Sequence, residues 1–116
     1  MKTQLYTLVE PVHTESIYKT QCRVQYAKVG ISASPSPHFS FQSTAVWPEA
    51  NYENAVRRGI LEVLTVAGYV DSSFGANFVL HEIDWHPIDS TEYAFLMAAK
   101  QATQQILDAA KIVCGS

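Results

Sequence analysis

The stretch from residue 81 to residue 92 concentrates side chains that could bind a metal ion or transfer a proton. Its first nine residues contain two histidines and three carboxylates, which are His81, Glu82, Asp84, His86 and Asp89. The zinc-binding pattern H-E-x-x-H places two histidines on one face of a helix. Here His86 follows His81 by five residues, and in a strand these two side chains point to opposite faces. We therefore expect no metal site in this stretch.

Sequence signatures of covalent catalysis and of nucleotide binding are missing from the chain. It has neither a G-x-S-x-G nucleophile elbow nor a G-x-x-x-x-G-K-[ST] phosphate loop, and its five glycines do not cluster. Cys22 and Cys114 are too few for a four-cysteine zinc site, and we expect both to be reduced thiols. We therefore expect a protein that is not an enzyme, has no catalytic residues and needs no cofactor.

Basic side chains are gathered in the first half of the chain. The formal net charge is -3, whereas nucleic-acid-binding domains are usually strongly basic. Residues 1–58 carry six basic and four acidic side chains, and residues 59–116 carry two basic and seven acidic ones. No acid occurs between Ser16 and Pro48, where Lys19, Arg23 and Lys28 lie. This positive region is either ordinary surface scatter or a patch that faces phosphates.

The strands that must position these residues follow from alternation and from turn residues. The chain has 116 residues, of which 47% are hydrophobic and 16% are charged. These values predict one folded domain, residues 1–116. We expect a turn at Ser34-Pro35-Ser36-Pro37. The expected strands are residues 5–10, continued by 13–18, then 23–32, 38–46 and 74–85.

Two helices are expected, one before and one after the last strand. Pro48 begins the first helix, because a missing N–H costs nothing at that position, and Gly68 ends it. Gly59 lies inside it, where we expect another backbone to come close. The second helix begins at the capping box Asp89-Ser90-Thr91-Glu92, in which Asp89 accepts from the backbone N–H of Glu92, and runs to about Val113. The order β-β-β-α-β-α predicts an α+β domain with both helices on one sheet face.

The residues after the last strand resemble domain IV of elongation factor G, the tRNA-mimicking arm of the ribosomal translocation GTPases. The family's pattern there is His-x-x-Asp-Ser-Ser-Glu-x-Ala-Phe. The chain matches it at His86, Asp89, Ser90, Glu92, Ala94 and Phe95, with Thr91 as a mild change. Weaker matches in the same order extend the resemblance from about residue 8 to about residue 110. They are Arg23, Gln25, Tyr26 and Val29, then Tyr52, Ala55, Val56, Gly59 and Ile60, then Ala67-Gly68-Tyr69.

The resemblance implies a four-stranded sheet that carries two helices and contains a left-handed β-α-β crossover. It also implies that the loop between the first two long strands and the histidine corresponding to His86 lie at a tip that enters the decoding region. A ring nitrogen and backbone N–H groups can bind RNA phosphates or 2′-hydroxyls. Trp85 either stacks on a base or closes the edge of the core. The residues expected to contact RNA are Lys19, Arg23, Gln25, Lys28, His86 and Ser90.

The chain departs from the family at several positions. Val24 and Ala27 stand where the family's loop has glycines, Ile83 replaces another glycine, and no GTPase is present in the sequence. We therefore expect a free-standing cytoplasmic module that binds the ribosome or another structured RNA. It would act without nucleotide hydrolysis, alone or beside a GTPase or other protein partner, and without a membrane. We expect His86 and the Lys19–Lys28 hairpin to project together from the extremity far from both termini.

Two alternatives remain at this point. The first is a protein-interaction module or homo-oligomer that kept the fold and lost RNA binding, with an apolar edge around Phe39, Phe41 and Trp47 as its contact surface. The second is a small hydrolase that uses His86 and Asp89.

Overall fold

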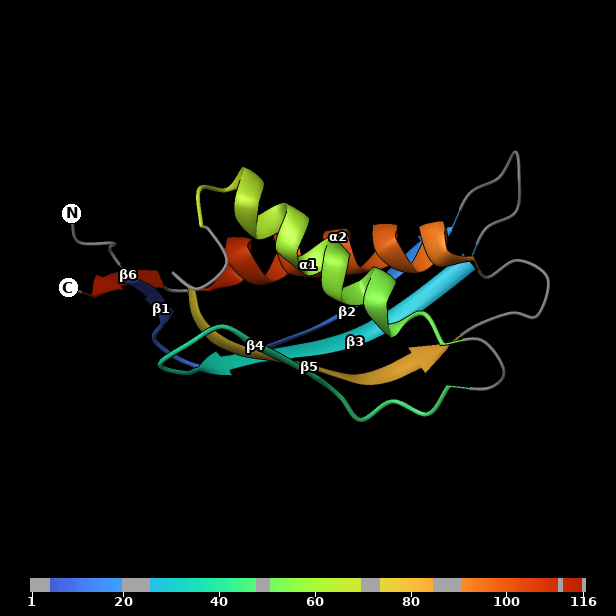
Figure 1. The fold of residues 1–116 in the computed structure, drawn as a ribbon, viewed down its shortest axis with the longest axis horizontal. Coiled ribbons are helices and arrows are strands. Elements are labelled where there is room, and N and C mark those ends of the chain that lie inside the picture. Colours follow the sequence, from blue (N-terminus) through green and yellow to red (C-terminus); the bar gives the residue numbers. More distant parts are fainter. Residues whose placement is uncertain are drawn as a thin grey trace.

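The described residues form six strands and two helices (Figure 1). The structure is a computed structural model that describes residues 5–19, 26–47, 51–69, 74–84, 91–110 and 112–115. The strands are β1 (Leu5–Leu8), β2 (Val12–Lys19), β3 (Tyr26–Pro35), β4 (Ser40–Ser43), β5 (Phe74–Asp84) and β6 (Ile112–Gly115). The helices are α1 (Glu53–Val66) and α2 (Glu92–Ala109).

The strands form one mixed sheet in the order β2-β3-β5-β1-β6, and β4 also pairs with β5. The pairs β2–β3, β3–β5 and β1–β6 are antiparallel, whereas β5 runs parallel to both β1 and β4. Because α1 connects the parallel strands β4 and β5, these elements form the β-α-β unit that the resemblance implies. Both helices cover the same face of the sheet (Figure 1), which confirms the predicted α+β class.

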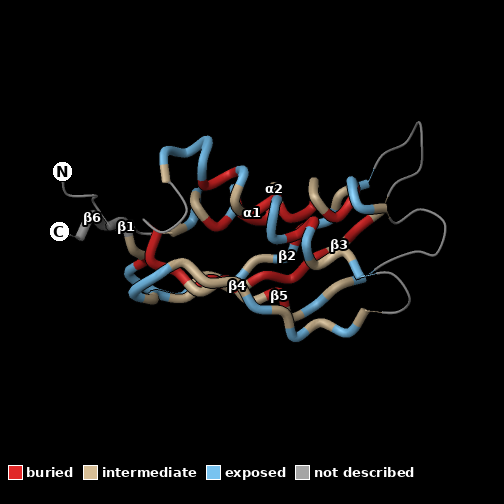
Figure 2. The backbone as a smooth tube through the Cα atoms, in the orientation of Figure 1, coloured by how far each residue is buried: buried red, intermediate tan, exposed pale blue. Residues whose placement is uncertain are grey.

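The apolar core lies between the sheet and the two helices, where the buried segments of strands and helices face one another (Figure 2). Its largest fully buried side chains are three phenylalanines, of which Phe74 and Phe78 come from β5 and Phe95 from α2. Fully burying side chains of this size contributes about 1.5–3 kcal/mol each. In the described part of the chain, no helix covers the opposite face of the sheet (Figure 1), so polar side chains can occupy it.

Two glycines have the conformational roles that the sequence predicts. At Gly59 the helices cross so closely that an added Cβ would lie 2.7 Å from the carbonyl oxygen of Leu96 in α2. This confirms that another backbone approaches α1 at this position. Gly68 follows α1 with a φ of 98°, a left-handed conformation that glycine adopts without steric cost. It therefore ends the helix as predicted.

The strands differ from the prediction near both ends of the chain and around residues 35–46. Residues 5–18 form two strands that pair with different neighbours, and the expected strand at 38–46 shortens to Ser40–Ser43. β3 continues through Pro35, so the turn lies after this residue. The predicted four-stranded sheet is therefore wrong in its strand count. The sixth strand, β6, includes Ile112 and Val113, which were assigned to the end of the last helix, because their backbone pairs with β1 instead.

Both helices begin later than predicted. Asn51 and Tyr52 are not helical, so Pro48, which lies outside the described residues, does not start α1. The Asn51 side chain accepts a hydrogen bond from the backbone N–H of Glu53 at 2.8 Å. At α2 the cap is Thr91, whose hydroxyl oxygen accepts from the N–H of Ala94 at 3.0 Å. The predicted Asp89 cap is therefore wrong. The helix begins at Glu92, so its first backbone N–H groups, which have no partner within the helix, lie next to Thr91.

Candidate nucleic-acid interface

Two connections leave the sheet at the same end of the molecule. Lys19 and Tyr26 face each other at the ends of β2 and β3, and Lys28 of β3 faces Asp84 at the end of β5. Residues 20–25 and 85–90 therefore start from adjacent strands. We call this end the loop end and define it by Tyr18, Lys19, Tyr26, Asp84 and Tyr93. β1 and β6, which carry the two termini, lie at the opposite end (Figure 1).

The predicted RNA-contacting residues divide into two groups. Lys19 and Lys28 lie on β2 and β3. Arg23, Gln25, His86 and Ser90 lie outside the described residues, as do Cys22, Trp85 and Asp89. The strand register places the starts of both connections side by side, and the common extremity of His86 and the Lys19–Lys28 hairpin stays a prediction.

Contacts between neighbouring elements fix the loop end. The hydroxyl of Tyr26 donates to Oδ2 of Asp84 at 2.7 Å and so joins β3 to β5. Partial burial, together with this hydrogen bond and the charge of Asp84, raises the pKa of Tyr26. Tyr18 of β2 and Tyr93 of α2 meet edge to face, with ring centroids 6.1 Å apart. The strands and the helix that carry both connections are therefore held in one arrangement.

The two described cations differ in how strongly their charges are compensated. Lys19 is exposed and has no ion-pair partner among the described residues. In contrast, Nζ of Lys28 lies 3.2 Å from Oε1 of Glu15 and 3.5 Å from Oε1 of Glu82. These carboxylates raise the pKa of Lys28, and Lys28 lowers the pKa of Glu15. The positive charge of Lys19 is therefore less compensated by nearby carboxylates than that of Lys28. RNA contact by either lysine stays a prediction.

An aromatic side chain at the loop end was missed by the sequence analysis. Tyr93 is 51% exposed, although it lies in the first turn of α2 beside the core. It precedes the buried Phe95 by two residues, and this spacing points a helical side chain away from the buried stripe. An exposed tyrosine can stack on a nucleic-acid base. Helical periodicity around Phe95 was the signal that could have identified it.

The apolar edge expected around residues 39–47 is not an exposed patch. Phe39 packs on Phe78 with ring centroids 5.7 Å apart. Trp47 packs on Phe95 at 5.1 Å. Phe41 is also partly buried against the core. These side chains were expected to form a contact surface, but their main contacts are with the interior.

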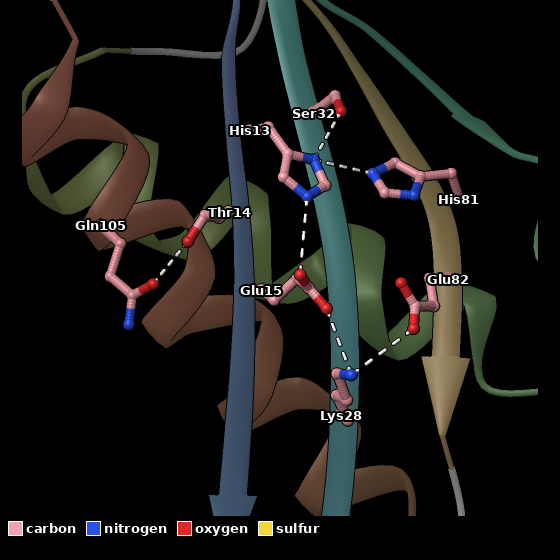
Figure 3. A network of polar contacts seen from close by, with 8 residues as sticks. All are labelled: His13, Thr14, Glu15, Lys28, Ser32, His81, Glu82 and Gln105. Carbon is pink, nitrogen blue, oxygen red and sulfur yellow. Dashed lines mark hydrogen bonds and ion pairs between the residues drawn. The ribbon is translucent and has the colours of Figure 1, made fainter.

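The uncovered sheet face carries a network of polar side chains from three strands (Figure 3). Its members are His13 and Glu15 of β2, Lys28 and Ser32 of β3, and His81 and Glu82 of β5. Sequence spacing placed His81 beside the residues that follow it, but its contact in the fold is with His13, 68 residues earlier. Within the described ranges, no three His, Cys, Asp or Glu side chains form a metal-binding group.

Comparisons with known proteins identify the family and agree with the fold. The family described as elongation factor G, domain IV, matches residues 5–111. A crystal structure of a protein from Thermus thermophilus superposes with a TM-score of 0.81 at 21% sequence identity. The match covers 98% of this chain and 18% of the Thermus chain, so this chain spans less than a fifth of that protein. None of the curated proteins matches. Neither helix in the described part of the chain is long and apolar enough to cross a membrane.

Proposed function

Because the chain belongs to the elongation factor G domain IV family, we propose that it binds ribosomal or other structured RNA in translation through its loop end. It acts without hydrolysing a nucleotide, alone or beside a GTPase partner. The observation that carries this proposal is the register of β2, β3 and β5, which brings the starts of both connections together. The residues proposed to contact RNA are Lys19, Arg23, Gln25, Lys28, His86 and Ser90, together with Tyr93.

The charge distribution at the loop end supports this assignment. Among the described residues at this end, Asp84 accepts a hydrogen bond from Tyr26 and keeps its negative charge, and Glu92 lies 3.6 Å from Arg58. Lys19 remains exposed with its charge uncompensated by the described residues. Approaching phosphates therefore meet the uncompensated charge of Lys19, which must outweigh the repulsion from Asp84.

The small number of cations sets the expected strength of binding. Each phosphate that a lysine or arginine neutralises releases counterions and makes affinity fall with salt. Two or three such contacts give a slope of about -2 for log affinity against log salt concentration. We therefore expect binding that is measurable at low salt and weak at physiological salt.

Co-sedimentation with ribosomes at low salt tests the proposal. Lys19→Glu and Arg23→Glu each change the net charge by two units at the loop end, and both are expected to reduce the bound fraction. Lys100→Glu on α2 makes the same charge change away from the loop end and serves as the matched control. The control is expected to bind like the wild type.

Two outcomes would contradict the proposal. One is a wild type that neither sediments with ribosomes nor shifts structured RNA at low salt. The other is equal loss of binding in all three variants, which would indicate a response to overall charge. A stable dimer, detected by light scattering, would favour the protein-interaction alternative if its interface covers the loop end.

A further inference from the structure

Two histidines meet on the uncovered face of the sheet, across the strand that separates them. His13 lies on β2 and His81 on β5, with β3 between them. Nδ1 of His13 and Nε2 of His81 are 3.0 Å apart, and the rings stack with centroids 4.7 Å apart (Figure 3). The hydroxyl of Ser32 lies 3.1 Å from the same Nδ1. Three polar atoms thus converge at one point.

An irregularity in the sheet allows this meeting. The β3–β5 register pairs Gly30 with Glu82 and Ile31 with Leu80, so His81 is an additional residue in β5. A bulge of this kind redirects a side chain. Gly30 leaves room for it, because an added Cβ would lie 3.2 Å from Cε1 of His81 and 3.1 Å from Cβ of Glu82. The bulge and the glycine together place His81 within reach of His13.

We propose that His13 and His81 bind one late transition-metal ion, such as Zn²⁺ or Cu²⁺, through these two nitrogens. Two facing imidazole nitrogens can share one proton as a hydrogen bond, and a metal ion can take the place of that proton. Metal–nitrogen bonds of about 2.0–2.1 Å in a tetrahedral site separate two ligand atoms by about 3.3 Å. The observed 3.0 Å is close to this separation, so small ring rotations suffice. The hydroxyl of Ser32 or solvent completes the coordination.

The charges around the pair favour a cation. Oε2 of Glu15 lies 3.9 Å from Nε2 of His13, which is the nitrogen that points away from His81. At this distance the carboxylate makes no hydrogen bond to the ring, and its contribution is the negative charge that it places near a bound cation. Glu15 is itself held by Lys28, and Glu82 lies on the other side of the same lysine. The two carboxylates and the one lysine beside the histidines thus carry a net negative charge. The His13 side chain is exposed to solvent, so an ion can reach it.

Metal titration of the full chain, free of any added histidine tag, tests this inference. Zn²⁺ and Cu²⁺ are titrated in competition with a chromogenic chelator, and one ion per chain is expected, with Cu²⁺ bound more tightly. His13→Asn and His81→Asn should each weaken binding by at least about tenfold, because the second ligand then binds alone. His38→Asn removes an exposed histidine between β3 and β4 and is expected to bind like the wild type.

A second measurement keeps the inference testable if a variant fails to fold. On the wild type, the imidazole NMR signals of His13 and His81 should shift together at one equivalent of Zn²⁺, ahead of those of His38 and His86. The absence of saturable binding would overturn the inference. So would a His38→Asn variant that loses as much affinity as the other two, or zinc shifts confined to His38 and His86.

Discussion

The hydroxyl of Tyr26 and the carboxylate of Asp84 join the two strands from which both connections leave. The pKa of Tyr26 is raised by partial burial and by Asp84. Because its pKa is raised in the folded state, protonated Tyr26 stabilises the fold. This stabilisation is fully present below the ordinary tyrosine pKa of about 10. It is lost as the pH rises through the folded-state value. Alkaline conditions should therefore weaken the contact between β3 and β5 that Tyr26 and Asp84 make at the loop end.

Tyr26→Phe is expected to lower the free energy of unfolding by about 1 kcal/mol at neutral pH, because one hydrogen bond is lost. Above about pH 10, the wild type should lose stability more steeply than the variant, since only the wild type has this tyrosine to ionise. Urea unfolding followed by circular dichroism at a series of pH values measures both effects. Asp84→Asn, which keeps an acceptor but removes the charge, should give an intermediate slope. Parallel pH profiles for all three proteins would contradict this explanation of the Tyr26 pKa.

At the residue scale, the sequence predicted some site features and missed others. Lys19 was expected to contact RNA from a projecting hairpin; its side chain is exposed at the end of β2, and the contact itself stays a prediction. The ion pairs of Lys28 depend on cross-strand neighbours that no local pattern reveals. The meeting of His13 and His81 depends on strand order and on a one-residue bulge. Contacts between residues this distant in sequence become visible only once the register is known.

At the scale of elements, the crossing of α1 and α2 holds the helical layer together at Gly59. A Cβ at this position would approach the carbonyl oxygen of Leu96 to 2.7 Å and Cβ of Ala99 to 3.0 Å. Alanine has the better helix propensity by about 1 kcal/mol, but overpacking of this kind costs about 1–3 kcal/mol. The steric effect should therefore exceed the propensity effect.

Gly59→Ala is expected to lower the free energy of unfolding by about 1–2 kcal/mol, measured by urea unfolding. Asn54→Ala, at an exposed position in the same helix, is the control and should stay within about 0.5 kcal/mol of the wild type. A stabilised Gly59→Ala variant would show that propensity outweighs the close approach of the helices.

The start of α2 provides a second test at this scale. Thr91→Ala removes the hydroxyl oxygen that accepts from the N–H of Ala94, and loss of such a cap costs about 1 kcal/mol. Thr91→Ser retains that oxygen and should keep most of the stability. Thermal unfolding of the three proteins compares them directly. Equal destabilisation by serine and alanine would exclude the hydroxyl as the cap.

The element boundaries show where local signals are insufficient. Periodicity predicted both helices, because their buried stripes repeat along the sequence. The start of α2 was misplaced because residues 89–92 offer two acceptable caps, and the tertiary position of the helix selects Thr91. Its end was misplaced because Ile112–Gly115 contains residues that suit either a helix or a strand. Pairing with β1, more than 100 positions earlier, decides in favour of a strand.

At the scale of the whole molecule, the fold separates the termini from the loop end. The described protein is elongated, with extents of 48 × 26 × 23 Å. β1 and β6 pair with each other, and Leu5 lies opposite Gly115. The connections between the long strands start from the other extremity (Figure 1). Under the proposed function, the contacts with RNA are therefore made at the end of the sheet opposite β1 and β6.

The most direct test of RNA binding by the loop end is photocross-linking from this end to ribosomal RNA. Tyr93, which is 51% exposed, is replaced by p-azidophenylalanine, an aromatic residue of similar shape. Val66, which is 89% exposed at the end of α1, receives the same residue as the control. After irradiation with ribosomes at low salt, we expect cross-links to RNA from position 93 and few from position 66. Equal cross-linking from both positions, or RNA cross-links from position 66 alone, would contradict RNA binding through the loop end.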